Sequence, residues 1–120
     1  MIKLLVCGSR SITDAAWVSE QISALVAEKG FALSELTLIE GGAKGVDSLA
    51  KAWAVANSVP VETHKADWAR YGRGAGHRRN AEMVMAADYV LILWDGSSKG
   101  TKNDIDLCIK NLKNYKLIEK

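Results

Sequence analysis

Short apolar runs alternate along this chain with stretches in which apolar residues recur every three or four positions. The runs are typical of strands buried on both faces, and the longer recurrence is typical of amphipathic helices. The run at 61–64 alternates apolar and polar residues after Pro60, which indicates a half-exposed edge strand. The pattern predicts five strands, at residues 2–7, 36–39, 61–64, 89–94 and 115–118.

Helices are predicted between these strands. The first ends at Gly30, since glycine commonly follows a helix C-terminus. The second and third span about 45–57 and 75–87, and residues 65–74 show no period, which predicts a surface loop. The expected inward-facing residues are Val18, Ile22, Leu25, Val26 and Lys29 on the first helix, Val46, Leu49, Ala50 and Trp53 on the second, Gly76, Asn80, Met83, Val84 and Ala87 on the third, and Ile105, Cys108, Ile109 and Leu112 on the last.

Strands that alternate with amphipathic helices through short turns predict right-handed βαβ units and a parallel sheet. We therefore expect an α/β fold, a Rossmann-like three-layer sandwich in one domain over residues 1–120. Its five-stranded parallel sheet should have the order 3-2-1-4-5, with helices on both faces. The first and fourth strands then lie side by side at the switch point, where a ligand crevice opens beyond their carboxyl ends.

Composition excludes several classes of protein. No apolar run reaches membrane-spanning length, and the first residues enter a strand-like pattern without a cleavage site, so we expect a cytoplasmic protein without membrane contact. Cys7 and Cys108 fall on apolar faces as expected buried thiols, and the sequence predicts neither a metal site nor a cofactor. The net charge of +2 does not favour nucleic-acid binding, but basic residues crowd the segment 65–79.

Three strand-to-helix turns should meet at the crevice. Free backbone N–H groups and the positive end of a helix dipole suit such turns to anion binding. Glycine in them allows a ligand to approach the main chain closely. The expected ligand-binding residues of the turns are Gly8, Ser9 and Arg10 in the first, Gly41, Gly42, Ala43 and Gly45 in the second, and Lys99, Gly100 and Thr101 in the third.

Other candidates lie beside these turns. Asp47 has two possible roles, a hydrogen bond to a ribose or catalytic water and complementation of the helix dipole. Arg78 and Arg79 occupy adjacent helical positions, so one should face the site and the other solvent, with Asn80 following toward the site. Trp94 ends the fourth strand and is expected to border the crevice as a base-stacking residue, whereas Trp53 is expected in the core.

Five motifs occur in order along the chain: Val6–Arg10, Gly41–Asp47 with Leu49, Ala50, Trp53 and Ala54, Ala66–Trp68, Ala75–Asn80 with Met83, and Lys99–Thr101. This order resembles the YspA/cpYpsA-related family of the SLOG superfamily. This superfamily of Rossmann-like domains also holds the LOG phosphoribohydrolases and the DNA-processing protein DprA. The resemblance implies a nucleotide or nucleotide-derivative site built by the turns.

We expect the chain to bind a nucleotide or nucleotide-derived molecule, as a sensor or processing domain. One alternative is an N-glycosidic hydrolase acting on nucleoside monophosphates, with Asp47 and Asp104 as catalytic residues. The chain departs from the LOG signature, because its proline and paired glycines are missing and Asp104 stands where the LOG glutamate would be. A second, less favoured alternative is DprA-like binding of single-stranded nucleic acid by the basic segment with Trp68 and Tyr71.

The third helix also suggests self-association. Met85 should point away from the sheet if Met83 packs against it, beside Ala81 and Ala86 on the outer surface. An apolar outer face on a helix of so small a domain favours coverage by a second subunit. We therefore expect a homodimer, and the alternative is a single exposed methionine, which is common.

Overall fold

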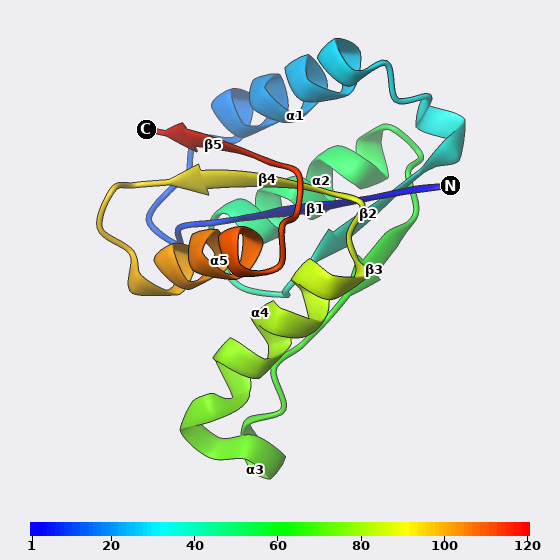
Figure 1. The fold of residues 1–120 in the computed structure, drawn as a ribbon. Helices are drawn as coiled ribbons and strands as arrows, with labels where there is room; N and C mark the ends of the chain where they lie inside the picture. The colour runs from blue at the N-terminus through cyan, green and yellow to red at the C-terminus, as the bar shows by residue number, and fades with distance from the viewer.

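A computed structural model describes residues 1–120, and its elements follow the predicted alternation (Figure 1). Each of the first four strands leads through a turn or loop into a helical segment that returns to the start of the next strand. The strands are Ile2–Gly8 (β1), Leu36–Glu40 (β2), Val61–Thr63 (β3), Tyr89–Trp94 (β4) and Tyr115–Glu119 (β5). The helices are Ala15–Lys29 (α1), Val46–Ala56 (α2), Trp68–Tyr71 (α3), Ala75–Ala86 (α4) and Lys99–Lys110 (α5).

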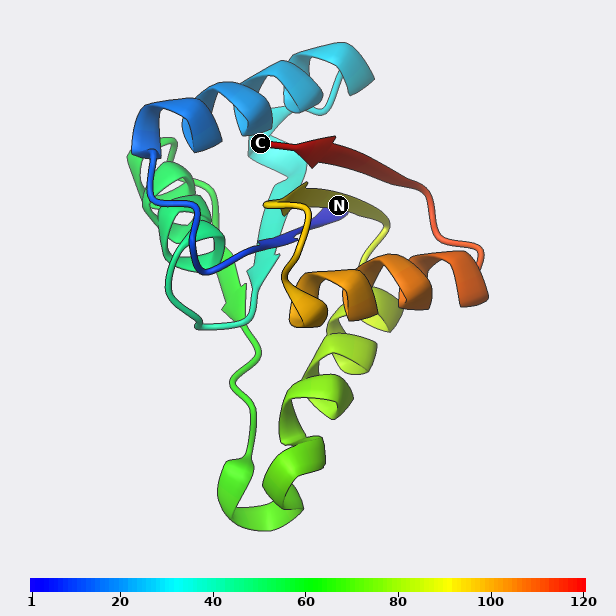
Figure 2. The same ribbon diagram turned by 90° about the vertical axis from the view of Figure 1, so that its left-hand side faces the viewer.

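The five strands form one parallel sheet in the order β3-β2-β1-β4-β5, which confirms the predicted topology. Successive strand residues point to opposite faces of a sheet, so Leu4 and Val6 pack in one core and Leu5 and Cys7 in the other. Helices α1 and α2 cover the first face, and α4 and α5 cover the second (Figures 1 and 2). Trp53 lies in the first core, as predicted, and both cysteines are buried and unpaired.

The segment 65–74, predicted as an irregular loop, is partly helical. Asp67 caps α3 by accepting a hydrogen bond from the amide of Arg70 at 3.1 Å, and a 3₁₀ turn, Gly72–Gly74, then leads into α4. The local capping bond provides order that hydrophobic periodicity does not reveal. Together α3, the 3₁₀ turn and the first half of α4 project beyond the sheet in both ribbon views (Figures 1 and 2), and we call this projection, residues 65–79, the arm.

Three predicted helix faces need correction. On α1, Lys29 is exposed, and its ammonium group lies over the ring of Tyr89 at 5.1 Å. On α4 the buried residue near the start is Ala75, whereas Gly76 faces Trp68 of the arm. On α5 the inward face is formed by Thr101, Asp104, Ile105 and Cys108, while Ile109 is 56% and Leu112 91% exposed. The observed inward face includes the polar residues Thr101 and Asp104 because these line a cavity. Leu112 lies beyond the end of α5, in a turn where its φ is +53°.

The outer surface of α4 is apolar in part. Met85 is 60% exposed, whereas Met83 is buried against the sheet, as the helical spacing predicts. No helix of the chain combines the length and the apolar character required to cross a bilayer.

Candidate functional site

The turns that follow β1, β2 and β4 meet at the carboxyl end of the sheet around a cavity of about 380 Å³. We call it the inner cavity. Its walls come from the starts of α2 and α5 and from the middle of α4, so elements from the whole chain contribute to it. The lining residues are Cys7, Gly8, Arg10, Ser11, Ala43, Asp47, Arg79, Asn80, Met83, Asp95, Ser98, Gly100, Thr101 and Asp104.

Ser9 holds the three turns together from beneath this cavity. It is fully buried, and its hydroxyl accepts a hydrogen bond from the amide of Asp95 at 3.0 Å and lies 3.3 Å from the hydroxyl of Thr101. Its carbonyl accepts a bond from the amide of Val46 at 3.4 Å. Ser9 therefore positions the turns and is not among the residues that line the cavity.

Two glycines are required for this close approach of the turns. A Cβ on Gly8 would lie 2.2 Å from the carbonyl oxygen of Leu93 on the neighbouring strand. Gly45 has φ +74°, and a Cβ there would lie 2.6 Å from the backbone of Ser9 and Arg10. Any other residue at these positions would push the turns apart.

The amides of the glycine turn, which we expected to face a ligand, bind carboxylates of the chain. The amides of Gly41 and Ala43 donate to Asp47 Oδ2 at 3.2 and 3.3 Å, and the amide of Gly42 donates to Glu40 Oε1 at 2.7 Å. Asp47, in the first turn of α2, thus fills the anion position that this turn creates.

The start of α5 keeps its amides free. Asp95 accepts hydrogen bonds from the amides of Ser97 and Ser98 at 2.9 and 2.8 Å and from the Ser11 hydroxyl at 2.6 Å, and these bonds hold its pKa well below the usual range. The next two amides, of Lys99 and Gly100, donate to no group of the chain. Gly100 lines the inner cavity, so its amide is available to an anion there, whereas Lys99 lines a separate hollow beside α5.

Two carboxyl groups are buried in the wall of the inner cavity. Asp47 and Asp104 are each 5% exposed. Burial raises the pKa of Asp47 to about 6, against the opposing effects of the Ala43 amide and Arg79. Burial likewise raises the pKa of Asp104 to about 7, with a further contribution from the charge of Asp47, while Cys7 and Arg79 act in the opposite direction. The Oδ1 atom of Asp104 has no hydrogen-bond partner in the protein.

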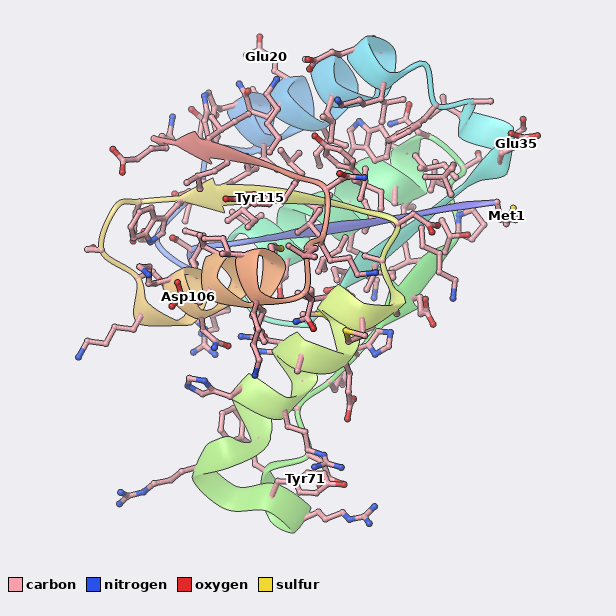
Figure 3. The ribbon with its side chains drawn as sticks, in the orientation of Figure 1. Met1, Glu20, Glu35, Tyr71, Asp106 and Tyr115 are labelled. Carbon is pink, nitrogen blue, oxygen red and sulfur yellow. The ribbon has the colours of Figure 1, made fainter.

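The two adjacent arginines of α4 divide as predicted, and the structure shows which one faces the site. Arg79 donates from Nη1 to the carbonyl of Gly41 at 2.5 Å and from Nε to Oδ1 of Asn80 at 2.9 Å. Arg78 instead lies over the ring of Tyr71 at 4.1 Å and is 3.6 Å from Glu82 (Figure 3, which labels Tyr71 on the arm). Arg79 therefore contributes to the inner cavity and Arg78 to the surface of the arm.

A metal site is not built by these residues. No group of three or more His, Cys, Asp or Glu side chains is arranged to hold an ion. Asp47, Asp95 and Asp104 all line the inner cavity, but their oxygens accept bonds from amides and hydroxyls or lie buried, as described above. The arrangement suits a ligand that brings both anionic and hydroxyl groups.

Comparison with known proteins gives the family. The profile of the YspA, cpYpsA-related SLOG family matches residues 2–71, more than half of the chain and most of the residues that form the β1 and β2 turns. The chain belongs to this family. A related protein, the Gene 61 protein of Mycobacterium phage D29, is 38% identical over 109 residues, which cover 86% of this chain and 85% of that protein.

Two solved structures share the fold of this SLOG family member. DNA processing protein A (DprA) from Streptococcus pneumoniae superposes with a TM-score of 0.79 at 17% identity, and the match covers 100% of this chain and 51% of that one. DprA from Helicobacter pylori, whose structure was described for its single-stranded DNA binding mode, superposes with a TM-score of 0.66 at 18% identity. That match covers 99% of this chain and 66% of the other, so the chain spans about half to two thirds of the DprA chains.

Nine of the predicted site residues of this SLOG domain line the inner cavity. Of the others, Gly41 and Gly42 line a neighbouring cavity beneath the arm, whereas Trp94 and Lys99 line a separate hollow beside α5 with His77. The Trp94 indole donates to the carbonyl of Ser98 at 3.1 Å and braces the α5 turn. The nine are Gly8, Arg10, Ala43, Asp47, Arg79, Asn80, Gly100, Thr101 and Asp104.

Several lining residues were not predicted. Asp95 and Ser98 belong to the sequence Asp95-Gly96-Ser97-Ser98, in which an aspartate before small residues is typical of a side-chain-bonded turn at a helix start. That signal was present and could have been used. Ser11, Cys7 and Met83 carry no local signal, because only the packing of β1, α4 and α5 brings them to the cavity.

Proposed function

We propose that this domain binds a nucleotide or a nucleotide-derived small molecule in the inner cavity. The observation that carries the proposal is the pair of arginines, Arg10 and Arg79, which form no ion pair although they line a cavity that also contains aspartates. Cationic groups without a carboxylate partner remain available to phosphate. The free amide of Gly100 at the start of α5 lies at the same cavity and adds a neutral donor for the same anion.

The remaining polar groups suit the sugar. The carboxyls of Asp47 and Asp104 can accept hydrogen bonds from ribose hydroxyls, and the unpartnered Oδ1 of Asp104 supplies a buried acceptor. Asn80 is held by Arg79 on one side and donates to Asn103 at 3.1 Å on the other. Membership of the YspA, cpYpsA-related SLOG family supports a ligand-binding role for this edge of the sheet.

A thermal-shift screen tests the proposal. The panel contains nucleoside monophosphates and diphosphates, ADP-ribose and cyclic dinucleotides, and at least one should raise Tm, because a ligand that binds only the folded state stabilises it. The Arg10→Ala variant should lose most of that shift. Arg73→Ala is the matched control, since Arg73 is exposed on the arm and lines neither the inner cavity nor the neighbouring cavity beneath the arm. No shift at millimolar ligand, or the same shift in both variants, contradicts the proposal.

N-glycosidic hydrolysis of a nucleoside monophosphate is a second candidate function. The observation that favours it is the pair of buried carboxyls with raised pKa values, about 6 for Asp47 and about 7 for Asp104. Near neutral pH the pair can supply one carboxylate and one carboxylic acid. The carboxylate takes a proton from a water molecule as the oxygen of that water attacks C1′ of the ribose. The C1′–N bond breaks as the carboxylic acid protonates the departing base.

Release of free base measures this second activity directly. Chromatography of each monophosphate after incubation should show base and ribose 5-phosphate in equal amounts. An Asp47→Asn, Asp104→Asn double variant should abolish the release. Asp106→Asn is the control on the same helix, since Asp106 lies on the exposed side of α5 and pairs with Lys102 (Figure 3). Equal release by all three proteins would assign the activity to a contaminant.

A further inference from the structure

A second cavity of about 310 Å³ adjoins the inner one beneath the arm, and we call it the outer cavity. The two share Arg10, Ala43 and Arg79, so these residues stand at the junction. The outer cavity lies between the glycine turn and the strand-to-helix connection of the arm, which includes Lys65, Ala66 and Trp68. Its lining residues are Arg10, Gly41, Gly42, Ala43, Lys65, Ala66, Trp68 and Arg79.

The charges of the two cavities differ. Three cationic residues, Arg10, Lys65 and Arg79, line the outer cavity, and no acidic residue does. None of the three takes part in an ion pair anywhere in the chain. The stem of Lys65 runs beside Gly42, whose Cβ position would be 3.3 Å from Lys65 Cγ. Three unpaired cations at one junction suit a group that spreads its negative charge over the oxygens of two linked phosphates, because one cation can then contact each side of the bridge.

Trp68 gives the outer cavity an aromatic wall. It is 56% exposed, which is unusual for so large an apolar side chain, and it begins α3 directly after the capping residue Asp67. The tip of its indole lies against Gly76 of α4, since a Cβ there would be 3.3 Å from Cη2. The indole is thus supported from the α4 side and retains exposed surface that can stack on a base.

We propose that the ligand occupies both cavities and is a nucleoside diphosphate whose distal phosphate carries a sugar. The base stacks on Trp68, the pyrophosphate lies at Arg10, Lys65 and Arg79, and the distal sugar reaches the carboxyls of the inner cavity. The inference rests on the proposed function and narrows its ligand class. A nucleoside monophosphate would leave one of the two cavities empty. A pyrophosphate at the shared arginines instead links a base in the outer cavity to a sugar in the inner cavity.

Isothermal titration with the whole chain tests the ligand class. The probes are ADP-ribose, UDP-glucose and GDP-mannose as two-part ligands, and AMP and ribose 5-phosphate as the two halves of ADP-ribose. At least one two-part ligand should bind about 10-fold or more tightly than both AMP and ribose 5-phosphate. AMP lacks the second phosphate and the distal sugar, and ribose 5-phosphate lacks the base, whose stacking contributes about 1–3 kcal/mol. Trp68→Ala should remove about 10-fold of this affinity, and Trp68→Phe should retain most of it.

Two controls distinguish the possible outcomes: ribose 5-phosphate, which has no base to stack, and a substitution on the arm outside the outer cavity. Neither Trp68 variant should change ribose 5-phosphate binding, and Arg70→Ala, on the same short helix but over the Tyr71 ring, should leave all affinities unchanged. If AMP or ribose 5-phosphate binds as tightly as every two-part ligand and Trp68→Ala has no effect, the outer cavity plays no part and only the proposed function stands. If Trp68→Ala lowers the affinity for ribose 5-phosphate as much as the affinity for the two-part ligands, the inference is also overturned. Absence of binding by every probe overturns both proposals.

Discussion

Replacement of Asp104 by asparagine should stabilise the folded chain at alkaline pH and not at acid pH. Asp104 is 5% exposed, and one of its carboxylate oxygens has no hydrogen-bond partner. Ionisation therefore places an incompletely compensated charge in the wall of the inner cavity, beside the carboxyl of Asp47. Asparagine keeps the shape of the side chain and removes the charge.

The magnitude follows from the pKa of the folded state. Burial raises the pKa of Asp104 from 3.8 to about 7. Below pH 4 the carboxyl is protonated in the folded and unfolded chains and has no differential effect. Between pH 4 and 7 only the unfolded chain ionises, so stability falls as pH rises, and above pH 7 the full cost of about 4 kcal/mol is present. A new amide without a partner costs about 1–3 kcal/mol at every pH, so it does not alter the pH dependence.

Urea denaturation at pH 4.5 and pH 8.5 measures the effect. Relative to the wild type, the free energy of unfolding of Asp104→Asn should increase by about 2–4 kcal/mol between the two pH values. Asp106→Asn should show no comparable increase, because Asp106 is exposed and its charge is solvated. A difference between Asp104→Asn and wild type that is the same at both pH values would show that Asp104 ionises normally, and the reasoning would fail.

Three further results are expected. Gly41→Ala should lower ligand affinity in titrations about 10-fold or more by displacing Arg79 Nη1, which would lie 2.8 Å from the new Cβ, whereas Gly74→Ala, with no atom within 4 Å, should bind normally. Ser9→Ala should lower the free energy of unfolding in urea by about 1–3 kcal/mol, since it removes the acceptor of the Asp95 amide, and no loss would refute its positioning role. Affinity for phosphate-bearing ligands should rise as pH falls from 8 to 6, because the two buried carboxyls, with pKa values of about 6 and 7, become neutral; a flat pH profile would contradict this.

The fold could be predicted from the sequence because each step depends on a local signal. Buried parallel strands give continuous apolar runs, and their alternation with helical stripes leaves few topologies. The position of the site followed from the topology, since parallel strands bring the ends of β1, β2 and β4 to one edge. The division of roles between Arg78 and Arg79 followed from helical geometry, although the sequence did not indicate which one faces inward.

The contents of the site could not be predicted to the same degree, because they depend on long-range packing. Ser9 lies 92 residues from Thr101 in the sequence, and only the folded sheet brings the two hydroxyls together. The glycine turn resembles an anion cradle in sequence, but the direction of the Asp47 carboxylate decides whether its amides are free. The helical arm depends on one capping bond at Asp67, which is too short-range for periodicity to detect.

The charges around the site also restrict the kind of ligand. The inner cavity contains buried carboxyls that resist ionisation, and the junction with the outer cavity contains cations without partners. A simple anion would satisfy the cations and be repelled by ionised Asp47 and Asp104, and a neutral sugar would satisfy only the carboxyls. A sugar joined to phosphate satisfies both groups at once, and its hydroxyls would supply the donors that Asp104 lacks within the protein. Buried aspartates reduce stability when they ionise, and the arginines lack carboxylate partners, so the presence of both within one cavity favours a phosphorylated sugar over inorganic phosphate.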